Sequence, residues 1–233
     1  MQVAILAGGL ATRLRPITET LPKSMVEIEG KPFLHYQIEF LKRNGVTDLV
    51  LCVGYLSEQI EHYFGDGHKW GVSIRYVHDG KTLLGTAGAL KRSADNLDNE
   101  FFVMYGDSYV FLDFKDVNTK FMQSGKPALM VVYRNDNRYD MSNVAVDNGL
   151  VTRYDKKNSN GDLVFIDYGV LLFSKKVLDM IPGNQVYPLE KVVTDLIQQK
   201  ELAVYETKNR FYEIGSHTGL DEFTKFIKDQ QNN

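Results

Sequence analysis

Three cations follow the first apolar segment of the chain in a pattern suited to binding a polyphosphate. Residues 2–6 form a short apolar run without helical periodicity, which predicts a buried strand. Ala7-Gly8-Gly9 follows it, and glycines at the end of a strand let the backbone turn sharply and approach a ligand. The cations that follow are Arg13, Arg15 and Lys23. Free backbone N–H groups beside fixed positive charges predict a site for a phosphate chain.

This segment differs from the two commonest phosphate-binding loops. No Gly-Lys-Ser/Thr closes it, as a Walker A loop requires, and it lacks the GxGxxG spacing of a dinucleotide site. A Gly-Gly pair by itself is also typical of an ordinary turn. The assignment therefore depends on the glycines and the cations together.

Two further segments combine glycine with groups that suit a nucleotide. Residues 83–97 predict a glycine turn continuing as a helix, in which Gly85 and Gly88 flank Thr86-Ala87. This opening would bring a helix N-terminus close to a flat or anionic ligand, although a plain loop-to-helix cap has the same pattern. The apolar strand 101–105 ends at Gly106-Asp107, where a carboxylate at the C-terminal end of a central strand is well placed to hold Mg²⁺.

The string LAGGLATRLRPITETLPKSM, residues 6–25, resembles the signature of the sugar-1-phosphate nucleotidyltransferases, LAGGxGTRLxPLTxxxPKPM. Ala11 replaces a glycine and Ser24 replaces a proline, and neither change removes a charged group. LGTAGA, residues 84–89, resembles the second nucleotide-binding segment of that family, which lies along the base and ribose. The resemblance covers nearly the whole chain and is weakest in the half that receives the sugar phosphate.

The resemblance implies a set of site residues. The expected nucleotide-binding residues are Leu6, Ala7, Gly8, Gly9, Thr12, Arg13, Lys23, Gly85, Thr86 and Gly88. The expected acceptor-binding residues are Tyr105, Asn143, Asp155, Lys156, Tyr168 and Gly169. The expected catalytic residues are Arg13, Lys23 and Asp107, and the expected Mg²⁺ ligands are Asp107 and Glu213.

Two of these positions depart from the pattern of the family. Its usual Glu-Lys-Pro appears here as Asp155-Lys156-Lys157, and the lysine pair could equally be a solvated hairpin end. The usual Asp-Ile-Gly-Thr appears as residues 213–216, Glu-Ile-Gly-Ser. Glu213 keeps the negative charge but is one methylene longer, which leaves the geometry of metal ligation open.

The order of predicted elements indicates an α/β fold. Strands and helices alternate regularly up to Arg134, which predicts a Rossmann-like, mostly parallel (mixed) central sheet flanked by helices. Beyond it, Asp147-Asn148-Gly149 between two short strands is a hairpin signal, and a small β-rich sugar-binding part is expected in the C-terminal half. We expect a single domain, 1–233, with a nucleotide-binding half at about 1–134 and an acceptor-binding half at about 135–233.

Composition limits the class of partner. The chain of 233 residues is 43% hydrophobic and 24% charged with a net charge of −3, so no basic field indicates nucleic acid. It has one cysteine, Cys52, and no apolar run long enough to span a membrane. The absence of a signal-peptide pattern leads us to expect a cytoplasmic protein. The resemblance also implies a possible homo-oligomer.

The expected reaction is transfer of a nucleoside monophosphate from an NTP to a sugar 1-phosphate, with Mg²⁺ as cofactor and pyrophosphate as the second product. LGTAGA resembles the guanylyl- or uridylyl-handling branches of the family more than its thymidylyl branch, and we expect GTP with mannose- or heptose-type phosphates. Cytidylyl or uridylyl transfer to another phosphate or phosphonate stays open, as does a non-catalytic subunit that senses nucleotide sugars. A glycosyltransferase is disfavoured, because Asp107-Ser108-Tyr109 lacks the second aspartate of a DxD motif.

Overall fold

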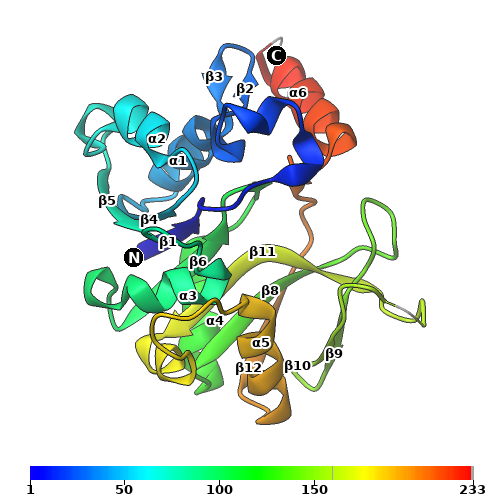
Figure 1. The fold of residues 1–233 in the computed structure, drawn as a ribbon. Coiled ribbons are helices and arrows are strands. Elements are labelled where there is room, and N and C mark those ends of the chain that lie inside the picture. Colours follow the sequence, from blue (N-terminus) through cyan, green and yellow to red (C-terminus); the bar gives the residue numbers. More distant parts are fainter. Residues whose placement is uncertain (159, 232–233) are drawn as a thin grey trace.

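The centre of the computed structural model, which describes residues 1–158 and 160–231, is a nine-stranded mixed sheet in the order β5-β4-β1-β6-β11-β8-β12-β10-β9 (Figure 1). Its strands are β1 (Gln2–Leu6), β4 (Asp48–Val53), β5 (Ser73–His78), β6 (Glu100–Tyr105), β8 (Ala128–Arg134), β9 (Val144–Asp147), β10 (Leu150–Tyr154), β11 (Phe165–Ser174) and β12 (Leu202–Thr207). Two small sheets pair β2 (Glu27–Ile28) with β3 (Lys31–Pro32) and β7 (Ser108–Tyr109) with β13 (Tyr212–Glu213).

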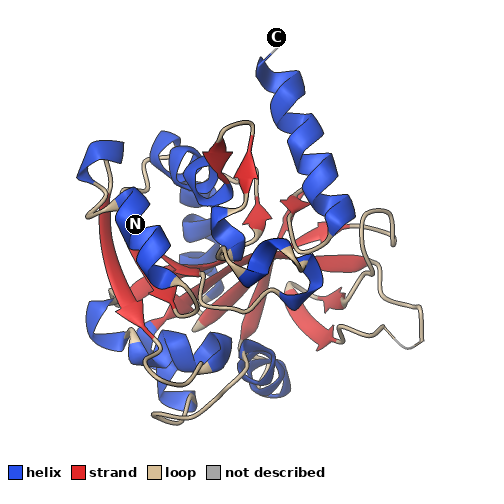
Figure 2. Ribbon diagram, turned by 45° about the horizontal axis from the view of Figure 1, so that its top comes forward, coloured by secondary structure: helices blue, strands red, loops and turns tan. Residues whose placement is uncertain are grey.

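Helices cover both faces of the large sheet. They are α1 (Phe33–Arg43), α2 (Ser57–Phe64), α3 (Gly85–Arg92), α4 (Phe114–Ser124), α5 (Leu189–Gln198) and α6 (His217–Gln231). One buried cluster joins α1, α2 and α4 to the sheet, and a second joins α3 and α5 to its other face. Helix α6 packs on a third cluster with Phe33 and Tyr109, and Figure 2 shows its C-terminal end extending away from the sheet. In the described part of the chain, no helix combines the length and apolarity that crossing a bilayer requires.

The predicted α/β class is confirmed, including most of the predicted elements. Strands β1, β4, β5 and β6 are mutually parallel, as the alternation with helices predicted. The predicted hairpin is present, with Asn148 and Gly149 at φ values of 48° and 79° between β9 and β10. The helix predicted over 83–97 is shorter than expected, because α3 ends at Arg92 and a separate 3₁₀ turn follows over Ala94–Asn96.

The position of β11 could not be read from the alternation. This strand lies between β6 and β8 and runs antiparallel to both, so the C-terminal half of the chain contributes to the same sheet as the N-terminal half. The pairing places residues 167–169 of β11 beside the end of β6, because Val170 is in register with Met104. Tyr105 and the loop that carries Asp107 are therefore next to residues 167–169 of β11.

The carboxyl end of β6 is held by a close backbone approach and by a buried glutamine. Gly106 N donates to Leu6 O at 3.1 Å, and a Cβ at Gly106 would lie 2.5 Å from that oxygen, so only glycine fits. Gln37 of α1 is fully buried, and its Nε2 donates to Tyr105 O at 3.0 Å and to Ser108 O at 2.7 Å. These contacts fix the backbone on both sides of Asp107.

We predict that Gln37→Met lowers the free energy of unfolding by about 1–3 kcal/mol, because two carbonyls that flank Asp107 lose their donor. The Oε1 atom of Gln37 has no partner among the described residues, and its removal offsets part of the loss. Urea denaturation measures the change. The matched control is Gln59→Met, which removes an exposed glutamine bond to Thr20 O and should change stability by less than about 0.5 kcal/mol. Equal losses of stability in the two variants would show that the two hydrogen bonds of Gln37 do not hold this loop in place.

We also predict that Cys52 does not react in the native protein. Its side chain is buried, and burial raises the pKa of the thiol to about 12, so almost no reactive thiolate exists at pH 8. A chromogenic disulfide reagent should label the protein stoichiometrically in urea and leave it unlabelled under native conditions. Full native labelling within minutes would show that this face of the sheet opens readily.

Candidate functional site

The predicted phosphate loop leaves β1 with its glycines in two different environments. Gly8 packs on the backbone that follows β4, since a Cβ at Gly8 would lie 3.2 Å from Gly54 N. Gly9 is exposed, and a Cβ there would meet no atom within 4 Å. Thr12 and Arg13 lie in a 3₁₀ turn, Thr12–Leu14, and both are exposed. The loop is therefore anchored at Gly8 and open to solvent beyond it.

Ala11 adopts a left-handed conformation in this loop, with φ 47° and ψ 46°. Such a backbone is rare for a residue with a Cβ, and Thr18 Oγ1 holds it by donating to Ala11 O at 2.9 Å. The family pattern has glycine at this position, and the conformation gives the physical reason for it.

Three predicted catalytic or metal-binding side chains come together at the carboxyl end of the sheet. Lys23 Nζ forms an ion pair with Asp107 Oδ2, and the two side chains are 18% and 32% exposed. A Cβ at Gly215 would lie 3.0 Å from Lys23 Nζ and 3.5 Å from Asp107 Oδ2, with Glu213 Oε2 closer still. Residues 84 positions apart in the sequence thus face one point.

The structure shows what the longer side chain of Glu213 contacts. Its Oε1 accepts a hydrogen bond of 2.7 Å from Ser216 Oγ, and its Oε2 accepts one from Gly215 N. Helix α6 begins at His217, so the carboxylate lies at the positive end of this helix. The contacts orient Glu213 toward Asp107 and Lys23, and each carboxylate oxygen keeps lone pairs for a further ligand.

This donor set fits a Mg²⁺ ion. Mg²⁺ is usually held by one or two carboxylates together with substrate phosphates, rather than by a cage of protein ligands. Asp107 and Glu213 provide two carboxylates at one point, and no cluster of three or more His, Cys, Asp or Glu occurs within residues 1–158 and 160–231.

The second predicted nucleotide segment packs against the chain itself. Ala87 N and Gly88 N, in the first turn of α3, donate to Tyr187 O at 2.9 and 3.1 Å. Thr86 Oγ1 accepts a bond of 2.8 Å from Leu189 N at the start of α5. A Cβ at Gly85 would lie 3.0 Å from Tyr187 O, so the close approach required of this glycine is to protein backbone. Nucleotide contact by Gly85, Thr86 and Gly88 stays a prediction.

Four of the predicted acceptor residues gather around a residue that the sequence reasoning missed. Asp167 Oδ2 accepts a hydrogen bond from Tyr105 OH, its Oδ1 accepts one from Gly169 N, and its backbone N donates to Asn143 Oδ1. Lys156 acts on Asp167 through its charge. Burial raises the pKa of the Asp167 carboxyl, and the hydrogen bonds it accepts oppose that shift. A single charged residue within the apolar run 165–173 was the signal available in the sequence.

The other two acceptor residues have different surroundings. The carboxylate of Asp155 accepts a bond of 2.9 Å from Lys157 N and so stabilises its own turn. Tyr168 is fully buried, and its hydroxyl accepts a bond of 3.1 Å from Phe111 N. The Tyr168 side chain therefore has no exposed surface for the expected substrate contact, because β11 turns it into the helix-covered core.

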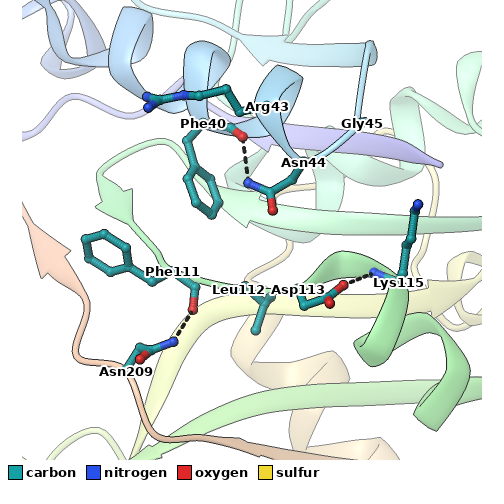
Figure 3. A pocket seen from close by; sticks show the side chains of 9 residues that line it. All are labelled: Phe40, Arg43, Asn44, Gly45, Phe111, Leu112, Asp113, Lys115 and Asn209. Carbon is teal, nitrogen blue, oxygen red and sulfur yellow. Dashed lines mark hydrogen bonds between the residues drawn. The ribbon is translucent and has the colours of Figure 1, made fainter.

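A cavity of about 610 Å³ lies elsewhere, between the end of α1 and the start of α4 (Figure 3). Its lining residues are Phe40, Arg43, Asn44, Gly45, Phe111, Leu112, Asp113, Lys115 and Asn209. None of the predicted site residues is among them, so the cavity and the carboxyl-end site are separate features.

The chain resembles known proteins over almost its whole length. A family model described as nucleotidyl transferase matches residues 2–230. The chain is 30% identical over 216 residues to the D-glycero-alpha-D-manno-heptose 1-phosphate guanylyltransferase of Campylobacter jejuni, covering 92% of this chain and 95% of that protein. It is 32% identical over 205 residues to the UTP–glucose-1-phosphate uridylyltransferase of Synechocystis sp., covering 81% of this chain and 53% of that protein. The chain therefore spans only about half the length of the Synechocystis relative.

Solved structures share the fold. HddC from Yersinia pseudotuberculosis, complexed with GMP-PN, superposes with a TM-score of 0.79 at 26% identity, covering 97% of this chain and 99% of that one. The inositol-1-phosphate CTP transferase from T. maritima superposes with a TM-score of 0.81 at 23% identity, covering 97% of this chain and 94% of that one. At this identity the similarity shows a shared fold.

We predict that Ala11→Gly stabilises the protein by up to about 1 kcal/mol, because the left-handed cost of a Cβ exceeds the extra entropy that glycine gains on unfolding. Urea denaturation measures the change. Ala89→Gly, in the helical backbone of α3, is the matched control and should lose about 1 kcal/mol or more. Destabilisation by both variants would show that the loop does not carry this strain.

Proposed function

Because this chain belongs to the nucleotidyl transferase family, we propose that it transfers a nucleotidyl group from an NTP to a sugar 1-phosphate and releases pyrophosphate. The observation that supports this most directly is the assembly of Lys23, Asp107 and Glu213 around one point. A glycine loop lies on the β1 side of this point, and the Asp167 cluster lies on the β11 side. The two sides suit a nucleotide and an acceptor respectively.

The chemistry needs positioning and charge compensation more than a base. A phosphate monoester has a second pKa of about 6, so the acceptor phosphate is already an anionic nucleophile at neutral pH. The barrier lies in bringing it to the α-phosphate of a highly charged triphosphate and in supporting the charge of the leaving pyrophosphate.

We assign the residues as follows. Lys23 orients the α-phosphate and the incoming phosphate oxygen, and the exposed Arg13 neutralises the β- and γ-phosphates and the leaving group. Lys156 orients the acceptor phosphate from an exposed ion pair with Glu190, in which its side chain is 54% exposed. Asp107 and Glu213 would hold Mg²⁺, which supplies positive charge to the phosphate oxygens.

Guanylyl transfer is the first choice for the nucleotide. The Campylobacter jejuni guanylyltransferase is the relative above that this chain matches over nearly the full length of both proteins, and the Yersinia structure contains a guanine nucleotide analogue. The Synechocystis relative is a uridylyltransferase and the T. maritima neighbour a CTP transferase, so UTP and CTP are the alternatives to test.

The test is pyrophosphate release by the purified protein, with ATP, GTP, CTP, UTP and dTTP each screened against a panel of sugar 1-phosphates and other phosphorylated acceptors in Mg²⁺. We expect release to require one NTP and one acceptor together, with GTP and a mannose- or heptose-type phosphate as the first pair. Tight nucleotide binding without turnover on any acceptor would favour the sensing subunit instead.

We predict that Asp107→Asn lowers kcat by roughly 10² or more, because it keeps the shape of the side chain and removes its charge. Arg13→Gln should lower kcat by a similar factor, because the negative charge of the leaving pyrophosphate loses a neutralising cation. The control is Asp147→Asn at the exposed end of β9, which should keep full activity. Unchanged turnover in Asp107→Asn would overturn the assigned site.

A further inference from the structure

Asp167 connects strands that the sequence places far apart. The residue is buried, with 8% of its surface exposed, and lies in β11. Its Oδ2 accepts hydrogen bonds from Tyr105 OH at 3.0 Å and from Tyr154 OH at 3.1 Å. Its Oδ1 accepts one from Gly169 N at 2.9 Å. One carboxylate thus fixes the end of β6, the end of β10 and the backbone of β11.

These bonds determine what the two tyrosines can offer to a ligand. A phenol has one O–H proton, and in this arrangement both protons are directed at Asp167. The oxygens of Tyr105 and Tyr154 then retain only lone pairs. Both tyrosine residues are partly exposed. We call their two hydroxyl oxygens, which accept hydrogen bonds without donating any to a ligand, the Tyr105–Tyr154 wall.

Lys156 and two carboxylates, those of Asp167 and Glu190, lie near this wall. Lys156 Nζ lies 5.8 Å from the centre of the Tyr154 ring and 3.6 Å from Glu190 Oε2. The carboxylates of Asp167 and Glu190 thus outnumber the single ammonium group of Lys156. If Lys156 takes the acceptor phosphate, as proposed above, a second anion on the acceptor would face uncompensated carboxylate charge.

We propose that Asp167 is a positioning residue that sets acceptor specificity, by making the Tyr105–Tyr154 wall accept hydrogen bonds only. The acceptor is then a phosphorylated sugar that presents hydroxyl or ammonium donors to this wall, and a sugar that carries a carboxylate is rejected. This inference rests on the proposed function for the identity of the acceptor. It assigns to Asp167 the choice among acceptors and no part in phosphoryl chemistry.

The variant that separates charge from shape is Asp167→Asn. The amide Nδ2 would donate to the tyrosine oxygens, so their own protons would turn toward the ligand and the buried negative charge would be lost. The wall would change from accepting to donating with little change in volume. Selectivity among acceptors should change much more than nucleotide affinity.

The experiment measures binding by calorimetry, with and without GTP, so that it does not depend on turnover. The probes are α-D-mannose 1-phosphate, α-D-glucosamine 1-phosphate and α-D-glucuronic acid 1-phosphate. We expect the wild-type protein to bind the better of the first two at least 10-fold more tightly than the glucuronic acid derivative, and Asp167→Asn to reduce this ratio to less than 3-fold. Affinity for the nucleotide should stay within 2-fold.

Two further variants keep the test decisive. Asp162→Asn removes an exposed carboxylate that pairs with Arg153 on the surface, and it should keep the wild-type ratio. Tyr154→Phe serves if Asp167→Asn does not fold. It removes one of the two hydroxyls and leaves Asp167 bonded to Tyr105 and Gly169. It should weaken the binding of mannose 1-phosphate and glucosamine 1-phosphate more than that of glucuronic acid 1-phosphate.

The possible results separate this inference from the proposed function. A ratio that survives in Asp167→Asn, equal affinity of the wild-type protein for all three probes, or no binding of any probe overturns the role of Asp167. Selective binding that collapses in Asp167→Asn supports that role. Pyrophosphate release is scored separately, and its absence despite selective binding overturns the transferase while leaving the specificity residue in place.

Discussion

The ion pair between Lys23 and Asp107 is the interaction on which the rest of the site depends. It forms because β1 and β6 are adjacent parallel strands, so the loops that leave their carboxyl ends meet at one edge of the sheet. The glycine at position 106 allows the two backbones to touch, and Gln37 holds the carbonyls on either side of Asp107. Without this rigid edge, two oppositely charged, partly exposed side chains would gain little from pairing.

A second constraint is the insertion of β11 between β6 and β8. This antiparallel strand joins the half of the chain proposed to bind the acceptor to the half proposed to bind the nucleotide, through main-chain hydrogen bonds to β6 and β8. The side chain of Asp167 then accepts hydrogen bonds from tyrosines at the ends of β6 and β10. The order of the strands thus brings the two proposed phosphate sites together, as the proposed transfer requires.

Two features that the family pattern marks for ligand binding, Glu213 before α6 and the glycines of α3, also make packing contacts within the chain. The carboxylate of Glu213 satisfies groups at the start of α6 while it faces Asp107. The glycines of α3 allow the segment before α5 to pass close to the helix, which joins the two helices on one face of the sheet. The family pattern marked both positions, and these packing contacts are compatible with a further role toward a ligand.

The sequence by itself determined the α/β class, the β9–β10 hairpin and the chemical nature of the loop residues. These follow from local periodicity, from turn residues such as Asn148-Gly149 and from side-chain type, all of which act over a few residues. Only the tertiary structure decided the place of β11, the burial of Tyr168, the contacts of Glu213 and the gathering of three donors on Asp167. Strand order and buried hydrogen bonds depend on packing between segments many residues apart, which no local pattern encodes.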